Sequence, residues 1–509
     1  MASCCLTRWV VLAVGAGSVF AQQRPSRTPT IPRTWDEKAL SEWATPLAHI
    51  GVRPSHISPA QYYALPVDNL KTWPVYLRGR EPEGYWKMLQ SVGPQPMIEP
   101  DKLKSREDWR KAGQTVFEQM DHLHLRTLDP AYIEIVRRGD LLVPLADGTA
   151  ANVRWVPTKA GVALGFPNCS ACHTLVTAEG SAIPGASAFA VPSGRTGPPG
   201  PGIIARIQQA QRFVTGGVPI RMRLGPVGVW LYTAFAVPWV GDDVHEKLKT
   251  MSEAEYQSHV AAGLRGGAVP RWNGSLYYPS KVPDLIGIEE RKYIDHTGTH
   301  LNRGIGDLMR YAALVSTAES THFGPHAVLP EGAELPAVRR SDEVLYALSL
   351  YMQTLKPPPN PNPVSRDSAA GERIFRREGC AGCHVPPLYT NNKLTLAAGF
   401  QPPKLLPASL DVLPVSVGTD PGLAMKTRKG TGYYKVPSLK GVWYRGHYLH
   451  DGSVASLEEM FNPERLKDSH VPGGFSPPGV KNRAIPGHEF GLKLKPHERE
   501  ELIAFLRTL

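Results

Sequence analysis

Two cysteine pairs, each followed at once by a histidine, constrain this chain more than any other feature of its sequence. Two residues between the cysteines put both sulfur atoms on one side of a single turn, where each can form a thioether bond to a vinyl group of a porphyrin. The adjacent histidine then lies beneath the iron as an axial ligand. The sequence therefore predicts two covalently bound haem c groups. The residues of the two motifs are Cys169, Cys172 and His173, and Cys380, Cys383 and His384.

The spacing of the motifs argues against the other common uses of paired cysteines. A thioredoxin-like pair needs no histidine after its second cysteine, and a zinc ribbon joins its two CxxC motifs across roughly 15–20 residues. Here residue 380 lies 211 positions after residue 169. The other two cysteines, Cys4 and Cys5, fall in a segment that we expect to be removed.

The first 21 residues have the pattern of a secretory signal peptide. Their single charged side chain, Arg8, is followed by an uncharged run from Trp9 to Phe20 and by the sequence VFA that ends at Ala21. The apolar run is too short to cross a bilayer as a helix. We therefore expect cleavage after Ala21, export to the periplasm and no stable membrane span afterwards; a retained anchor is the alternative.

The composition indicates a folded chain that is rich in loops. The 48 glycines and 49 prolines exceed the usual share, but not to the level of a low-complexity chain. The 488 residues after Ala21 suffice for two or three domains. Without Arg8 they carry 56 basic and 46 acidic side chains, with no dense basic tract, so we predict no nucleic-acid partner. An anionic redox partner or a surface polyanion is the alternative reading of the positive charge.

Each motif lies between a short helical pattern and a closing helix. The preceding patterns are residues 112–117 and 370–375. Ser341 can cap the first closing helix, and Pro496 can begin the second. The two helices end alike, in YMQTL and FLRTL. Helix, haem motif and closing helix form the layout of a small cytochrome c domain, so we predict a mainly α, loop-rich fold with two such domains.

The proline-rich run at residues 357–363 marks the boundary between these domains, because it cannot be helical and should be an extended linker. We predict an N-terminal extension over residues 22–106 that packs on domain one. The first cytochrome c-like domain then covers residues 107–356, and the second covers residues 364–509. The first is enlarged by insertions, since Ser341 lies 168 positions after His173.

The C-terminal region resembles a known family. The segments GYYKVPSLKGVWYRG at 432–446 and YLHDGSVASLEE at 448–459 resemble the bacterial di-haem cytochrome c peroxidase superfamily. Within it, WYRG at 443–446 and PGHEFG at 486–491 are most similar to the branch that includes the di-haem rubber (latex) oxygenases. The resemblance covers the second domain well, and the first through its haem motif and the order of its elements. It does not separate peroxidases from oxygenases.

The resemblance implies different roles for the two haems. One iron, saturated by two protein ligands, relays electrons, while the other keeps a position for peroxide or oxygen. We expect the reactive iron on His173 and the relay iron on His384. The favoured distal ligand of the relay iron is His488, in the PGHEFG segment, and Met460 is the alternative. The other candidates in the same loop are Met425, His447, His450 and His470.

No spacing singles out a distal ligand for the first haem. The candidates are His245, His259, His296, His300, His322, His326, Met222, Met251 and Met309. A charged stretch could supply an acid or base for peroxide cleavage, although a solvated loop is the simpler reading. It contains Glu289, Glu290, Arg291, His296 and Arg303. Three tryptophans could lie between the haems, or could serve only in packing: Trp239, Trp272 and Trp443. We assign none of these residues as catalytic.

These features lead to one principal prediction of function and two alternatives. The principal one is an oxidoreductase that reduces hydrogen peroxide at the first haem, with electrons from a small cytochrome or cupredoxin. The alternatives are an oxygenase that cleaves an unsaturated hydrocarbon such as polyisoprene with O2, and a non-enzymatic electron-transfer cytochrome. A calcium site, and the choice between monomer and homodimer, are left open.

Overall fold

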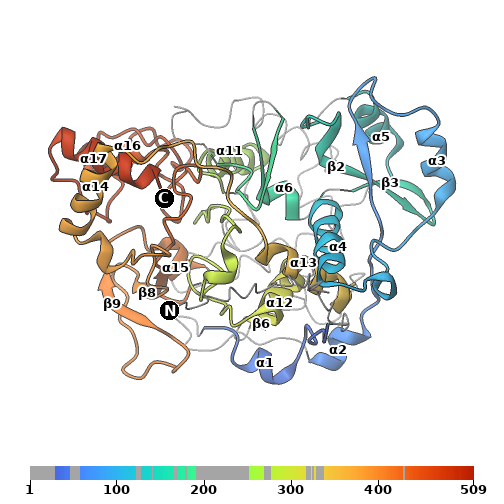
Figure 1. The fold of residues 1–509 in the computed structure, drawn as a ribbon, viewed down its shortest axis with the longest axis horizontal. Helices are drawn as coiled ribbons and strands as arrows, with labels where there is room; N and C mark the ends of the chain where they lie inside the picture. Colours follow the sequence, from blue (N-terminus) through green and yellow to red (C-terminus); the bar gives the residue numbers. More distant parts are fainter. Residues whose placement is uncertain are drawn as a thin grey trace, which may run out of the picture.

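A pair of packed helices forms the framework of each half of the chain (Figure 1). In the first half, α4 (Arg106–Gln119) packs on α13 (Asp342–Gln353). In the second, α14 (Arg366–Arg377) packs on α17 (Pro496–Arg507). The helical patterns expected before the haem motifs lie in α4 and α14, and both closing helices form as predicted. The side chain of Ser341 accepts a hydrogen bond from the backbone of Val344, which confirms it as a cap.

The structure is a computed structural model. It describes residues 29–45, 58–121, 128–139, 142–165, 167, 169–177, 180–190, 252–268, 277–316, 322–323, 326–327, 338–427 and 430–509. The expected signal peptide at residues 1–21 lies outside this set. So do the candidate residues Met222, Trp239, His245, Met251 and Trp272, and the side chains of His322 and His326.

A glycine lies at the crossing of each helix pair, where the two backbones come very close. A Cβ atom built on Gly113 would lie 1.9 Å from the carbonyl oxygen of Ala347. One built on Gly371 would lie 1.9 Å from the carbonyl oxygen of Glu501. Any larger residue would push the helices apart, so the Ala-Gly dipeptide shared by α4 and α14 has the same packing role in both halves.

Small sheets flank the helices, so the expectation of a mainly α fold is met only in part. One three-stranded antiparallel sheet packs beneath α3 and α5 on a core that includes Val75, Trp155 and Leu164. In another, β8 pairs antiparallel with β10 and parallel with β9. The elements of these layers are β1 (Trp73–Tyr76), β2 (Thr149–Thr158), β3 (Gly161–Gly165), α3 (Tyr85–Val92), α5 (Pro130–Arg137), β8 (Leu394–Leu396), β9 (Val412–Ser416) and β10 (Tyr433–Lys435).

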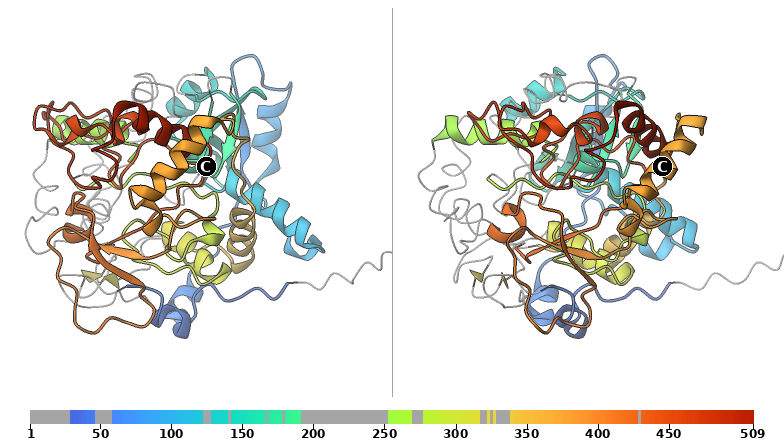
Figure 2. Two further views of the ribbon diagram at one scale, coloured as in Figure 1. Left: turned by 60° about the vertical axis from the view of Figure 1, so that its left-hand side comes forward. Right: turned by 90° about the vertical axis from the view of Figure 1, so that its left-hand side faces the viewer.

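Short elements complete the described part of the chain. In all views of Figures 1 and 2, the N-terminal helices α1 and α2 lie at the opposite end of the molecule from α17. These elements are α1 (Glu37–Ser41), α2 (Pro59–Ala64), η1 (Pro100–Lys102), α6 (Cys169–His173), β4 (Thr174–Val176), β5 (Ala182–Pro184), α11 (Glu253–Arg265), η2 (Ile288–Glu290), α12 (Ile305–Ser316), β6 (His322–Phe323), β7 (His326–Ala327), η4 (Cys380–Gly382), α15 (Gly422–Lys426), α16 (Leu457–Met460) and η5 (Pro463–Leu466).

The N-terminal extension contacts both halves. Trp35 and Trp43 are fully buried, in one apolar cluster with Leu345 of α13 and Leu394 of β8. The proline-rich segment at 357–363 contains neither helix nor strand, and the side chain of Asn360 donates a hydrogen bond to the carbonyl oxygen of Arg507. The division into domains at this segment stays a prediction.

A sequence repeat relates the two halves. Lys281–Leu285 reads KVPDL and Lys435–Leu439 reads KVPSL, so residue 435 lies 154 positions after residue 281. Gly287 and Gly441 are also 154 positions apart, and both have φ near 75° (74° and 75°). The ends of the two closing helices are separated by the same number of residues. Only glycine takes this left-handed conformation without strain, so the repeat is one of backbone shape as well as of sequence.

Each copy of the repeat pairs with a loop of the other half. The backbone N–H of Lys281 donates to the carbonyl of His450, and that of Lys435 donates to the carbonyl of His296, both at 2.9 Å. The side-chain ammonium groups of the two lysines also donate to carbonyl oxygens of the other half. The ammonium group of Lys281 donates to His447, and that of Lys435 donates to Tyr293. The two halves are therefore joined through reciprocal main-chain contacts.

Replacement of Gly371 by alanine tests the helix crossing. We expect the free energy of unfolding to fall by roughly 1–3 kcal/mol, because the added methyl group overpacks the contact with Glu501. Thermal unfolding measures the effect. The matched control is Gly382→Ala, because a Cβ atom there meets nothing within 4 Å and the first haem motif has Ala171 at the same place. Equal stability of the two variants would contradict the close crossing.

Candidate haem sites

The second haem motif opens into a cavity between the two halves. The motif residues Cys380, Cys383 and His384 line it, together with His488. His384 is only 8% exposed. Its ring Nδ1 lies 3.1 Å from the carbonyl oxygens of both Tyr389 and Pro437, so this nitrogen carries the proton and donates. The tautomer leaves Nε2 as the basic nitrogen, which is the usual arrangement for a histidine that binds a metal.

His488 faces His384 across this cavity. Their ring centroids lie 6.3 Å apart, with 56° between the ring planes. Two imidazoles that bind one metal ion, each through a nitrogen at about 2.0–2.1 Å, have their ring centres roughly 6 Å apart. Burial lowers the pKa of His488 to about 4 and also lowers the pKa of His384. Both rings are therefore neutral at pH 7, the form in which histidine binds a metal.

A buried arginine shapes the loop that presents His488. The Arg465 guanidinium donates to the carbonyl oxygens of Ile485, Gly487 and His488 at 2.6–2.9 Å. His488 has a φ of 49°, an unfavourable backbone angle for a residue with a side chain. Because Arg465 binds this loop at three carbonyl groups, it stabilises the strained conformation that points the ring of His488 at His384.

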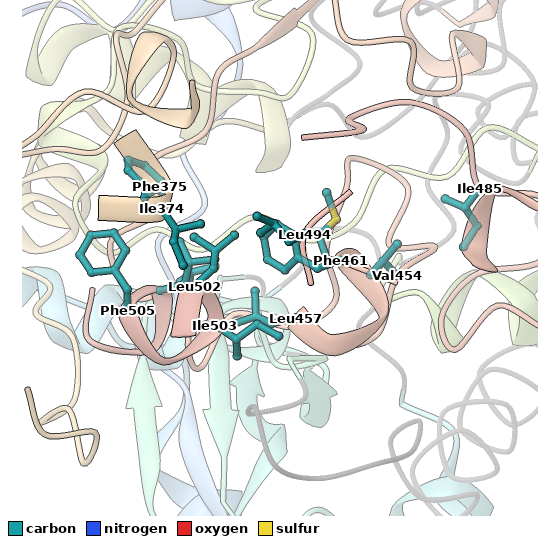
Figure 3. Close-up of a cluster of buried hydrophobic side chains, with 13 residues drawn as sticks. Ile374, Phe375, Val454, Leu457, Phe461, Ile485, Leu494, Leu502, Ile503 and Phe505 are labelled. Atoms are coloured by element: carbon teal, nitrogen blue, oxygen red, sulfur yellow. The ribbon is translucent and has the colours of Figure 1, made fainter. Parts of the chain in front are cut away.

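Apolar side chains from three helices enclose the same cavity. Phe375 of α14, Leu457 of α16 and Leu502 of α17 belong both to its lining and to the largest cluster of the second half. Figure 3 shows these three side chains within one cluster. Such a wall suits the porphyrin of a haem, which is a large flat apolar group.

The chemistry of the cysteines also fits haem. The four motif cysteines form no disulfide. Burial raises the pKa of the Cys380 thiol to about 11 and raises that of Cys383 as well. The thiols of Cys380 and Cys383 are therefore protonated at pH 7, which disfavours a thiolate metal site at this motif.

The other predicted ligands of the second haem lie in different places. Met460 and His450 line the cavity, and the ring of His450 stacks on Tyr434 with centroids 4.3 Å apart. His470 lies 2.9 Å from a carboxylate oxygen of Glu459. Met425 packs at the edge of a separate cluster, and His447 is buried with its ring beside Gly267. The structure thus brings His488, Met460 and His450 to the site, and leaves Met425 and His470 elsewhere.

The histidine of the first haem motif is held by a backbone carbonyl group, like the histidine of the second. It forms α6, and the ring Nδ1 of His173 lies 3.0 Å from the carbonyl oxygen of Pro283. Pro283 and Pro437 hold the same position in the KVPDL and KVPSL segments. A proline carbonyl therefore orients the histidine of both motifs. This role was not predicted from the sequence, although the repeat of five residues with one difference is a visible signal.

The candidates for the distal side of the first haem are dispersed. His300 lies 3.0 Å from Asp295 and tilts against the ring of Trp43. Met309 is buried in the same cluster as Trp43. His259 contacts the ring of Tyr277. The ring Nε2 of His296 lies 3.0 Å from the carbonyl oxygen of Lys281, and His296 lines the cavity of the second motif. The distal ligand of the first haem stays unassigned.

The charged stretch predicted near the first haem separates in space. Glu290 pairs with Lys440 at 3.2 Å, and Arg303 pairs with Asp307 at 2.8 Å. Arg291 instead turns into the cavity between the halves. Trp443 packs edge-on against the ring of Tyr444, with centroids 5.1 Å apart. In the described part of the chain, no group of three or more histidine, cysteine or acidic side chains could hold a separate metal ion, so the calcium site stays an open prediction.

Comparisons with known proteins match parts of the chain. A family model described as RoxA-like, cytochrome c-like matches residues 432–470. Over 157 residues the chain is 27% identical to the methylamine utilization protein MauG of Methylorubrum extorquens. Over 166 residues it is 26% identical to the cytochrome-c peroxidase IdrP1 of Denitromonas iodatirespirans. Each match covers 29% of this chain, and they cover 35% and 41% of the two relatives.

The chain is also similar to a solved MauG-like protein associated with microbial copper homeostasis, at 16% identity and a TM-score of 0.28, over 53% of this chain and 91% of that one. The sequence matches confirm the resemblance to the bacterial di-haem cytochrome c peroxidase superfamily, near the RoxA branch. The family model also agrees with the prediction of a cytochrome c-like domain in the second half of the chain. In the residues that the structure describes, we find no helix with the length and apolar character to span a bilayer.

Replacement of His488 by alanine tests the facing pair of histidines. We expect the second haem to change from low spin to high spin, because its iron loses one of two strong ligands. Electron paramagnetic resonance of the oxidised protein measures the change. The control is Met460→Ala, which removes the alternative ligand from the same cavity and should keep the low-spin signal. A low-spin signal that persists in His488→Ala but is lost in Met460→Ala would reverse the assignment.

Proposed function

We propose that this chain is a periplasmic di-haem c-type cytochrome that reduces hydrogen peroxide. In this proposal one haem is bonded to Cys169 and Cys172, and its iron, held by His173, is the reactive one. The other is bonded to Cys380 and Cys383 and relays electrons from a small cytochrome or cupredoxin. Each haem supplies an iron that changes its oxidation state by one electron.

The single observation that supports this division of roles is the 6.3 Å separation of the His384 and His488 rings. Two neutral imidazoles at this distance would both bind the iron of a haem held in the cavity, and an iron with two strong protein ligands suits electron relay. His173 is expected to bind the other iron, while its Nδ1–H group donates a hydrogen bond to the carbonyl oxygen of Pro283.

The protein's own groups would prepare the relay site in two ways. The carbonyl oxygens of Tyr389 and Pro437 accept hydrogen bonds from the Nδ1–H group of His384, which makes Nε2 a stronger ligand for iron and holds the ring in place. The apolar wall of Phe375, Leu457 and Leu502 excludes water from the porphyrin face. A dry, fixed site favours rapid electron transfer, because few dipoles reorganise when the charge changes.

One observation favours a second candidate function. The matched family model is RoxA-like, and the PGHEFG segment that contains His488 is similar to the branch of the rubber oxygenases. The alternative is therefore an oxygenase that cleaves an unsaturated hydrocarbon such as polyisoprene with O2. A plain electron-transfer cytochrome is the third candidate, and both its irons would be saturated.

Catalytic assays of the purified holoprotein separate the three candidates. We expect hydrogen peroxide to be consumed in proportion to the oxidation of an added reduced cytochrome c, at two electrons per peroxide. Carbonyl products and oxygen uptake with polyisoprene, without external electrons, would favour the oxygenase instead. If both haems are low spin and fail to respond to peroxide, oxygen and cyanide in either redox state, the electron-transfer cytochrome is supported and the peroxidase is excluded.

A further inference from the structure

Three basic side chains and one carboxylate meet where the two halves join. We call Lys281, Asp284, Arg291 and Arg445 the seam cluster. All four line the cavity that also contains Cys380 and His384. The side chains of Asp284, Arg291 and Arg445 are 6%, 12% and 14% exposed. The first three residues come from the first half and Arg445 from the second.

Asp284 lies between the two guanidinium groups. Its Oδ2 is 3.0 Å from Nε of Arg445, and its Oδ1 is 3.9 Å from Nη2 of Arg291. The two guanidinium groups also donate to the backbone carbonyl oxygens of Asp284, Ile286 and Ser438. The Arg445 guanidinium lies 5.8 Å from the ring centroid of Tyr444. The ammonium group of Lys281 also donates to a carbonyl oxygen, that of His447. The seam cluster therefore has three cations and one carboxylate, and that carboxylate lies between the two arginines.

Among the described residues, two further carboxylates act on the cluster: Asp451 raises the pKa of Lys281 and Glu290 that of Arg291, but each also lies near another cation. Asp451 lies 3.6 Å from Arg483, and Glu290 pairs with Lys440. Lys435 lines the same cavity and adds a further basic group. Burial, and then the charges of Arg445 and Arg291, lower the pKa of Lys281 to about 8, while Asp284 and Asp451 oppose the shift. Buried charges need partners, so the cluster calls for an anion of about two negative charges.

The cavity indicates which anion this is. It contains both cysteines of the second motif and both facing histidines, so a haem held there lies in the same space as the seam cluster. Haem carries two propionate groups, and arginine matches a carboxylate with a planar pair of donors. We propose that Lys281, Arg291 and Arg445 bind the propionates of the haem that is bonded to Cys380 and Cys383. This inference rests on the proposed di-haem function.

The repeat explains why the cluster contains one carboxylate. Asp284 is matched by Ser438 in the second copy, and the Ser438 hydroxyl donates to the carbonyl oxygen of Leu388 at 2.6 Å. The two arginines themselves are matched, since residue 445 lies 154 positions after residue 291. The single haem therefore contacts both copies of the repeat, and its binding joins the halves of the protein.

Two variants with opposite changes of charge test the proposal in the holoprotein. Arg445→Gln removes a cation, so the second haem should become harder to reduce. We expect the equilibrium constant for its one-electron reduction to fall by a factor on the order of ten, which corresponds to a reduction potential lower by about 59 mV. Asp284→Asn removes the anion and should shift the potential the other way. Arg310→Gln is the control, because Arg310 is also buried against a carboxylate, Asp307, but does not line the cavity.

Resonance Raman spectroscopy supplies the second readout. We expect the propionate bending band of the second haem to shift in Arg445→Gln and Arg291→Gln, and to stay unchanged in Arg310→Gln. An unchanged band in both cavity variants, or potentials that shift in the same direction in Arg445→Gln and Asp284→Asn, would overturn the proposal. A count of two haems per chain with these negative results would leave the di-haem function intact, whereas fewer than two haems in the unmodified protein would contradict that function itself.

Discussion

The hydrogen bond between a motif histidine and a proline carbonyl is the interaction on which both sites depend. It occurs twice, from His173 to Pro283 and from His384 to Pro437. It fixes the tautomer of each ring, and it ties each haem motif to a distant segment of the chain. Because the same segments bind loops of the other half, the orientation of each histidine is coupled to the way the halves fit together.

The packing around this interaction depends on a few positions where only glycine fits. Gly113 and Gly371 allow the backbones of two helix pairs to come into contact. Gly287 and Gly441 turn the chain after the KVPDL and KVPSL segments. Between these rigid elements lies a cavity with one apolar side and one strongly basic side. A group with a flat apolar body and an anionic edge satisfies both sides, so the chemistry of the cavity and of the haem motif lead to the same ligand.

Local features that depend on few neighbouring residues could be predicted from the sequence. The Ser341 cap and the start of a helix at Pro496 are confirmed. The two haem motifs and the choice of His488 over five other side chains also came from short patterns, and they stay predictions. The pairing of Lys281 with His450 and of Lys435 with His296 could not be predicted this way, since it joins segments far apart in the chain. The small sheets were also missed, because strands of three to five residues such as β8 and β9 carry too little periodicity.

The crossed pairing of the KVPDL and KVPSL segments has a consequence for how such a protein can exist. Either half taken by itself would lose the carbonyl partner of its own lysine, and the loop that should receive the lysine of the other half would lose its donor. Because both halves belong to one polypeptide, each lysine has its carbonyl partner, and each loop its donor, within the same chain.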